Sequence, residues 1–87
     1  MLIKKLIWDE WNIEHIARHN VKLEEVEQVC KGIHRLNKWK KAMYRVIGQT
    51  ADGRYLTIFI AQRGKQSFYP VTARDSTLKD RRAYKNK

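Results

Sequence analysis

The chain has 87 residues and a single cysteine, so it is long enough for one small domain and cannot form an internal disulfide. It carries 19 lysine and arginine residues against 9 aspartate and glutamate residues, a formal net charge of +10. No apolar run is long enough to span a bilayer, and the first residues lack the pattern of a secretory signal, so we expect a cytoplasmic protein without a membrane segment.

The positive charge is concentrated in the middle and the last part of the chain. Residues 1–30 have a net charge of −2, whereas residues 31–51 carry six basic side chains and no acidic one. The net charge is +2 over residues 52–73 and +4 over residues 74–87. A basic excess confined to part of a small domain is typical of proteins that bind a polyanion. We therefore expect nucleic acid, or an acidic protein that covers the same surface, rather than a purely solubilising surface.

Two helices are predicted in the first part of the chain, after an apolar segment at residues 2–8 that is either a strand or a lead-in. Residues 10–19 predict the first helix, because Asp9 is a favourable N-cap and Asn20 tolerates the left-handed conformation that ends helices. Its apolar residues at helical spacing, which we expect to face the core, are Ile13, Ile16 and Ala17.

Residues 23–31 predict the second helix, which Gly32 ends. Four side chains lie at i, i+3, i+4 and i+7 and form one stripe that should face the core: Val26, Val29, Cys30 and Ile33. The three glutamates of this helix are expected to face mostly outward.

β-structure is predicted from residue 33 onward. Residues 33–39 predict a first strand, and two lysines form the turn after it. The strongest local signal follows, because Asp52 and Gly53 favour a tight hairpin turn between strands at residues 43–50 and 55–61. One face of the second of these strands should form the floor of the core, through Leu56, Ile58 and Ile60. Its opposite face also carries large side chains, so we expect the strand to be covered on both sides.

A further strand and a helix are predicted next. Residues 67–73 predict the fourth strand, which should lie at an edge or contain a bulge because Pro70 has no N–H to donate. Ser76 or Thr77 should cap a last helix that runs to about residue 85, and Thr77 and Asp80 have capping-box spacing at its start. The predicted fold class is therefore α+β, a single domain over residues 1–87 with two N-terminal helices, a four-stranded antiparallel meander and a C-terminal helix.

A metal site is one candidate for chemistry. His15 and His19 are spaced i, i+4, and Cys30 and His34 repeat that spacing, which gives the ligand types of a zinc site. However, Cys30 fits the apolar stripe of the second helix, and no Cys-x-x-Cys or His-Glu-x-x-His element accompanies it. We therefore predict no metal and no other cofactor.

Metal-free cleavage of RNA is a second candidate. Attack by the ribose 2′-hydroxyl needs a proton acceptor, cations for the charge that develops on the phosphate, and a proton donor for the leaving oxygen. The histidines, the arginines near strand ends and Tyr84 provide these groups. Many basic chains do so too, and composition alone favours His19 as a helix-end residue that hydrogen-bonds a carbonyl.

Binding without catalysis is the third candidate. The aromatic residues Trp39 and Tyr44 are interleaved with basic residues, an arrangement that can stack bases and neutralise phosphates. In the alternative interpretation, these aromatic side chains cover the core. The candidate nucleic-acid-binding residues are Lys38, Lys40, Lys41, Arg45, Arg81 and Arg82.

Three stretches of the sequence together resemble the BrnT-like toxins. Residues 8–21, which read Trp-Asp-Glu-Trp-Asn-Ile-Glu-His-Ile-Ala-Arg-His-Asn-Val, and the Glu-Glu-Val at residues 24–26 resemble the opening of that family. The hairpin at residues 45–50 and 53–56 resembles its middle. Residues 72–84, which begin Thr-Ala-Arg-Asp and end Arg-Arg-Ala-Tyr, resemble its close.

This resemblance implies a RelE-like α+β fold and a metal-independent ribonuclease that is the toxin of a type II toxin–antitoxin pair. It also implies a DNA-binding antitoxin of the ribbon-helix-helix type, through which the toxin can oligomerise. The positions that match the family's functional residues, and are our catalytic candidates, are His19, Arg54, Arg74 and Tyr84. The alternative function is a non-catalytic basic module of the same fold that binds nucleic acid or docks an antitoxin.

The sequence departs from the family pattern beside Arg74. Asp75 stands where many members have a basic residue or proline. An acidic group there would weaken the hold of Arg74 on a phosphate, unless Asp75 points away to cap the last helix.

Overall fold

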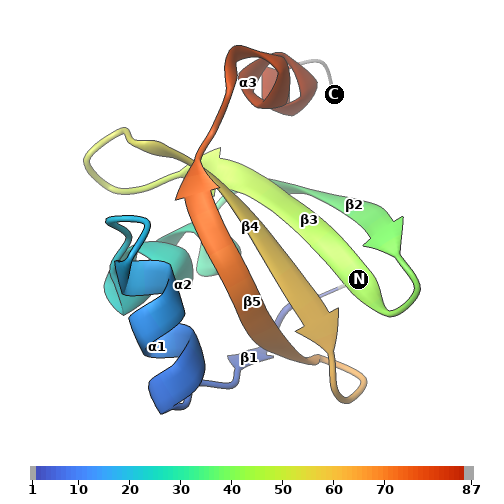
Figure 1. Cartoon of the computed structure of the whole chain (residues 1–87). Helices are drawn as coiled ribbons and strands as arrows, with labels where there is room; N and C mark the ends of the chain where they lie inside the picture. The colour runs from blue at the N-terminus through green and yellow to red at the C-terminus, as the bar shows by residue number, and fades with distance from the viewer. Residues whose placement is uncertain (1, 86–87) are drawn as a thin grey trace.

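A computed structural model describes residues 2–85 as three helices and a five-stranded sheet (Figure 1). In chain order the elements are β1 (Lys5–Leu6), α1 (Glu10–Ala17), α2 (Leu23–Lys31), β2 (His34–Lys40), β3 (Met43–Gln49), β4 (Tyr55–Gln62), β5 (Ser67–Asp75) and α3 (Leu78–Lys85). The strand order is β1-β5-β4-β3-β2. The predicted α+β class with two N-terminal helices and one C-terminal helix is confirmed.

The sheet is mixed: it contains the predicted four-stranded antiparallel meander, but it has a fifth strand that the predicted fold lacked. β2 to β5 are antiparallel neighbours, but β1 adds a fifth strand that runs parallel to β5, with Lys5 opposite Ser67 and Leu6 opposite Phe68. The segment that was either a strand or a lead-in is therefore a strand. A pair of residues is too short to show an alternating pattern in the sequence, and only the partner strand defines it.

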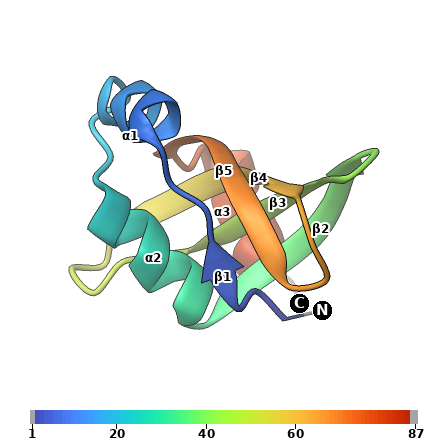
Figure 2. The same cartoon turned by 90° about the horizontal axis from the view of Figure 1, so that it is seen from below.

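The core lies between the sheet and the two N-terminal helices. Figures 1 and 2 show α1 and α2 on the same side of the sheet. The three β4 residues predicted to form the floor of the core are fully buried, namely Leu56, Ile58 and Ile60. They pack in one cluster with Val26 and Val29 of α2 and Phe68 of β5.

α1 turns a different side to the core than predicted. Asn12 and Ile16 are its buried residues, whereas Ile13 and Ala17 are exposed, so these two core assignments were wrong. The amide of Asn12 causes this orientation, because its Nδ2 donates to the carbonyls of Ile7 (2.9 Å) and Pro70 (3.0 Å). A polar residue is therefore an anchor of the helix on the sheet.

The predicted end signals of both N-terminal helices are present, but α1 ends at Ala17, two residues earlier than predicted. Asp9 caps α1, and Asn20, with a φ of 62°, adopts the left-handed conformation after it. α2 has its predicted bounds and ends at Gly32. Ile33 is exposed, contrary to prediction, because the backbone of Gly32 is extended and the helical phase stops there.

A bulge in β5 accommodates Pro70, which has no N–H to donate to a neighbouring strand. Phe59 pairs with Thr72 and Ile60 pairs with Pro70, so Val71 is the extra residue of β5. The strand does not lie at the edge, since β1 pairs with its first residues. Of the two predicted solutions for Pro70, the bulge is confirmed.

The turns lie close to their predicted positions. β2 extends through Lys40, and Lys41 and Ala42 form the turn to β3, one residue later than predicted. The β3–β4 hairpin is confirmed, with Gly53 at a φ of 87° and its N–H donating to the carbonyl of Thr50.

Candidate nucleic-acid interface

Three arginines from three strands lie on the sheet face opposite α1 and α2. Side chains alternate along each strand, so the residues next to the buried core residues point to this face. Strand pairing places Arg35, Ile47, Thr57 and Arg74 in one row across the sheet. The next row contains Asn37, Arg45, Phe59 and Thr72. We call this surface, together with α3, which packs on it, the α3 face. Arg35 was not among the predicted site residues. Its spacing of two from Asn37 along β2 could have indicated that the two side chains share a face.

Asp80 attaches α3 to this face. Its carboxylate accepts hydrogen bonds from Arg74 Nη1 (2.6 Å), Thr57 Oγ1 (2.9 Å) and the N–H of Thr77 (3.0 Å). The Asp80 N–H in turn donates to Thr77 Oγ1, which confirms the predicted capping box. Asp80 is the buried residue of α3 and is 5% exposed. A charged anchor thus holds α3 to the sheet, in addition to the contact of the Tyr84 ring with Tyr55.

The charge of Asp80 is strongly favoured in the folded state. Burial opposes ionisation, but the hydrogen bond from the Thr77 N–H and the contact with the Arg74 guanidinium outweigh it, and the pKa of Asp80 falls to about 2. Asp80 is therefore an ionised partner for Arg74 over the whole physiological pH range.

We expect the protein to lose stability in acid as Asp80 is protonated. Because the folded state lowers the pKa of Asp80 to about 2, its contribution is complete above the pKa of an unfolded aspartate and is lost as the pH falls from about 4 to about 2. The contribution is about 2 kcal/mol, of which about 1 kcal/mol is lost by about pH 3. Urea unfolding across this range should show a weaker pH dependence for Asp80→Asn, while Asp52→Asn in an exposed turn should behave like the wild type. An unchanged slope in Asp80→Asn would contradict this assignment.

Trp39 and Arg45 extend the α3 face toward the β2–β3 turn. The Trp39 ring meets Phe59 edge to face at 5.2 Å between centroids, and Arg45 Cζ lies 5.9 Å from the Trp39 centroid. Arg74 Cζ lies 5.8 Å from the Phe59 centroid. Guanidinium groups and aromatic rings therefore alternate across this surface.

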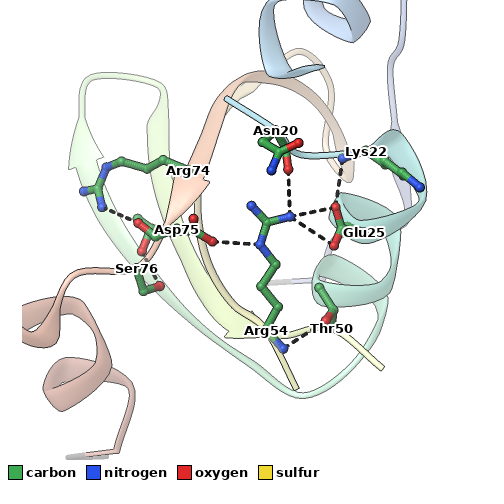
Figure 3. Close-up of polar contacts among 9 residues, drawn as sticks. Asn20, Lys22, Glu25, Thr50, Arg54, Arg74, Asp75 and Ser76 are labelled. Atoms are coloured by element: carbon green, nitrogen blue, oxygen red, sulfur yellow. Dashed lines mark hydrogen bonds and ion pairs between the residues drawn. The ribbon is translucent and has the colours of Figure 1, made fainter. Parts of the chain in front are cut away.

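Arg54, in contrast, is a structural junction on the α1–α2 side of the sheet (Figure 3). Its Nη1 donates to the carbonyl of Asn20 (2.8 Å) and to both carboxylate oxygens of Glu25 (3.0 and 3.2 Å). Its Nε donates to Asp75 Oδ1 (2.7 Å). The hydrogen bond that Arg54 donates to Asp75, and then those that it donates to Glu25, raise the pKa of Arg54 against the effect of burial. Two carboxylates thus neutralise this guanidinium and link α2, β4 and β5.

Figure 3 also shows where Asp75 points relative to Arg74. The Asp75 carboxylate binds Arg54, and the contact between Arg74 and Asp75 is made to the Asp75 backbone carbonyl, at 3.2 Å. Asp75 does point away from Arg74, but Thr77 and Asp80 cap α3 in its place. The acidic partner of Arg74 is therefore Asp80.

The four catalytic candidates fall into two groups. Arg74 and Tyr84 lie on the α3 face, where the Tyr84 ring meets Tyr55 at 5.9 Å between centroids. Arg54 and His19 belong to the other side, where His19 follows α1 and its ring contacts that of His15 at 5.4 Å. The structure does not bring all four residues together, because Arg54 lies on the α1–α2 side of the sheet with Asp75, whereas Arg74 points to the opposite face.

The predicted nucleic-acid-binding residues are also divided. Arg45 lies on the α3 face, Lys40 and Lys41 are exposed at the β2–β3 turn, and Arg82 is exposed on α3. Arg81 Cζ lies 4.3 Å from the centroid of Tyr55, and Lys38 Nζ lies 4.8 Å from that of Tyr44. The Tyr44 ring packs against Phe68 of the core at 5.9 Å. Of the two predicted aromatics, Tyr44 therefore covers the core, and Trp39 remains exposed.

The residues considered for a metal site have other environments. Cys30 is buried in the core, and burial, with a smaller effect of the Glu27 charge, raises the pKa of its thiol to about 12. His34 Nδ1 lies 3.0 Å from the carbonyl of Gly32. Within residues 2–85, no group of three or more histidine, cysteine, aspartate or glutamate side chains is arranged to hold a metal ion. No helix in the same range is long and apolar enough to cross a membrane.

Comparison with solved structures gives the fold a name. The crystal structure of the ribonuclease toxin BrnT from Brucella abortus superposes with a TM-score of 0.67, over 84% of this chain and 96% of that one. The chain has a BrnT-like fold. The sequence identity is 18%, and the likeness therefore concerns the fold alone. No protein-family model and no curated protein sequence matches the chain. The BrnT-like fold predicted from the three sequence stretches is thereby confirmed.

Proposed function

We propose that this protein is a BrnT-like toxin that cleaves RNA without a metal ion and is the toxin of a type II toxin–antitoxin pair. The observation that carries the proposal is the group of three arginines in two adjacent rows of the α3 face, namely Arg35, Arg45 and Arg74. The shared fold with a protein described as a ribonuclease toxin supports it. Arginine suits this role because its planar fork can engage two phosphate oxygens.

In the proposed reaction, the ribose 2′-oxygen attacks the adjacent phosphorus and the bond from phosphorus to the 5′-oxygen breaks. The products are a 2′,3′-cyclic phosphate and a 5′-hydroxyl. Arg74 and Arg45 stabilise the negative charge that develops on the phosphate oxygens, and Asp80 orients Arg74. The 2′-hydroxyl loses its proton to solvent, and Tyr84, the proposed proton-transfer group on this face, donates a proton to the leaving 5′-oxygen and regains one from solvent. A role for His19 and Arg54 in the same step requires RNA that continues past the end of β5.

The antitoxin would act by covering the same surface. The α3 face and the β2–β3 turn include side chains from residues 31–51. This segment carries six basic side chains and no acidic one. We propose a ribbon-helix-helix DNA-binding antitoxin whose acidic residues meet this surface, so that complex formation blocks RNA binding and cleavage together.

The deciding experiment is an RNA cleavage assay in EDTA with purified protein, with and without ribosomes, followed by end-group analysis of the products. We expect cleavage that leaves a 2′,3′-cyclic phosphate and that the antitoxin suppresses. RNA that stays intact under both conditions would contradict the proposal.

The alternative is a non-catalytic module that binds nucleic acid, and the contact between Asp80 and Arg74 favours it, because this carboxylate occupies part of the arginine fork. It predicts RNA binding that weakens steeply with salt and yields no product.

A further inference from the structure

We propose that Trp39 is a stacking platform for an unpaired base, so that the α3 face binds single-stranded RNA in preference to duplex RNA. This inference rests on the proposed function and adds two features to it. The substrate is single-stranded RNA, and Trp39 is the side chain that distinguishes it from a duplex. Three observations about the surroundings of Trp39 support it.

The first observation is the backbone at Trp39. The pairing of β2 with β3 passes from Lys38 opposite Tyr44 to Lys40 opposite Met43, so Trp39 is the extra residue of a β-bulge. Bulges redirect a side chain and recur beside functional sites. Trp39 follows Arg35 and Asn37 at a spacing of two along β2, so the indole lies on the α3 face, where it meets Phe59 edge to face.

The second observation is that Trp39 is 49% exposed although it is among the largest side chains of the chain. A tryptophan that served only the core would be largely covered, as the Tyr44 ring is by its packing on Phe68. The ring meets Phe59 edge to face and Arg45 lies over it, so both neighbours restrict the rotation of the indole. A base that stacks on it therefore loses little to side-chain ordering.

The third observation is the placement of cations around the indole. Arg45 lies over the Trp39 ring, and Arg74 lies over the ring of Phe59, which is the neighbour of Trp39. Arg45 Nε is buried and has no hydrogen-bond partner among the described residues. A nucleotide whose base stacks on Trp39 thus has arginines beside it for the adjoining phosphates. Stacking surfaces combined with a cationic track are the general solution for single-stranded nucleic acids.

Duplex RNA cannot use this arrangement. In an A-form helix the bases are stacked on one another, and proteins reach mainly phosphates and 2′-hydroxyls. The arginines would still attract a duplex by charge, but Trp39 would contribute no stacking. Dependence on Trp39 should therefore distinguish the two forms of RNA.

The test compares two exposed tryptophans on different sides of the molecule. Trp39→Ala removes the proposed platform, and Trp11→Ala, at a residue of α1 that is 58% exposed, is the matched control. The probes are a fluorescently labelled unstructured RNA with 2′-O-methyl riboses, which the enzyme cannot cleave, and its duplex. We expect Trp39→Ala to weaken single-strand binding about 5- to 150-fold, the range for the loss of one stacked base. Duplex binding should change less than about 2-fold, and Trp11→Ala should change neither.

The outcomes separate this inference from the proposed function. If the wild type binds and cleaves RNA but Trp39→Ala binds single strands as tightly as the wild type does, the stacking inference is wrong and the proposed function is unaffected. An equal loss for single strands and duplex also overturns it. If the wild type binds no RNA, but an acidic antitoxin binds in a manner that depends on Trp39, both proposals fail and the face is a protein interface. Trp39→Phe, which keeps a ring, should retain most of the affinity and guards against misfolding of the alanine variant.

Discussion

Replacing Arg74 by lysine is expected to lower RNA cleavage at least about 100-fold while the protein stays folded. Lysine keeps the positive charge that the buried Asp80 carboxylate needs, but it lacks the planar fork that engages two phosphate oxygens. Alanine would be a poorer test, because it would leave Asp80 without its closest charged partner and so mix a loss of stability with a loss of activity. The measurement is kcat/KM in EDTA, with urea unfolding of the same preparation.

The same change at Arg54 makes this experiment decisive. Arg54→Lys alters a guanidinium that Glu25 and Asp75 already neutralise on the opposite side of the sheet. We expect it to lower the free energy of unfolding by about 1 to 2 kcal/mol, through its lost hydrogen bonds, and to retain cleavage under conditions where it is folded. If Arg54→Lys loses cleavage and Arg74→Lys does not, the active site lies on the α1–α2 side.

Asn12→Ala is expected to lower the free energy of unfolding by about 3 to 4 kcal/mol. The side chain is fully buried and donates to the carbonyls of Ile7 and Pro70, while its Oδ1 accepts the N–H of Asp9. Alanine would leave these backbone groups without partners, each at a cost of about 1 kcal/mol or more. In a protein of this size such a loss is a large part of the total stability. Urea unfolding of wild type and variant measures it.

Asp9→Ala is the control for Asn12→Ala. It removes the N-cap side chain of α1 and the hydrogen bond from Tyr69, but leaves the Asn12 amide in place. The expected loss is about 1 kcal/mol, the usual cost of an N-cap. If Asn12→Ala lowered the free energy of unfolding no more than Asp9→Ala does, the hydrogen bonds from Asn12 to Ile7 and Pro70 would not stabilise the protein.

Local signals predicted most of the elements, because their causes are local. The Gly53 hairpin, the capping box at Thr77 and Asp80, and the end of α2 at Gly32 each depend on a few neighbouring residues. Ile13 was assigned to the core by apolar spacing alone. The hydrogen bonds of Asn12 decided the orientation of α1 instead, and one of their acceptors, Pro70, is distant in the sequence.

The candidate site was less predictable for a related reason. The sequence drew attention to Arg74 and Arg54 but could not tell that they lie on opposite faces, which depends on the register of β4 and β5. It also made Asp75 the critical acidic residue, since Asp75 adjoins Arg74. Strand alternation sends adjacent side chains apart, and Asp80, six positions away on α3, meets Arg74 instead.

The pairing of β1 with β5 governs the order in which the protein can fold during its synthesis. β1 precedes the helices and the other strands, yet its partner residues Ser67 and Phe68 belong to β5, the last strand in chain order. Ile3 and Leu6, which belong to the core, cannot be covered until that strand is available. Contacts between such distant segments form late and slow folding. Until β5 is in place the sheet is therefore incomplete, and the arginine rows, which include Arg74 of that strand, cannot form.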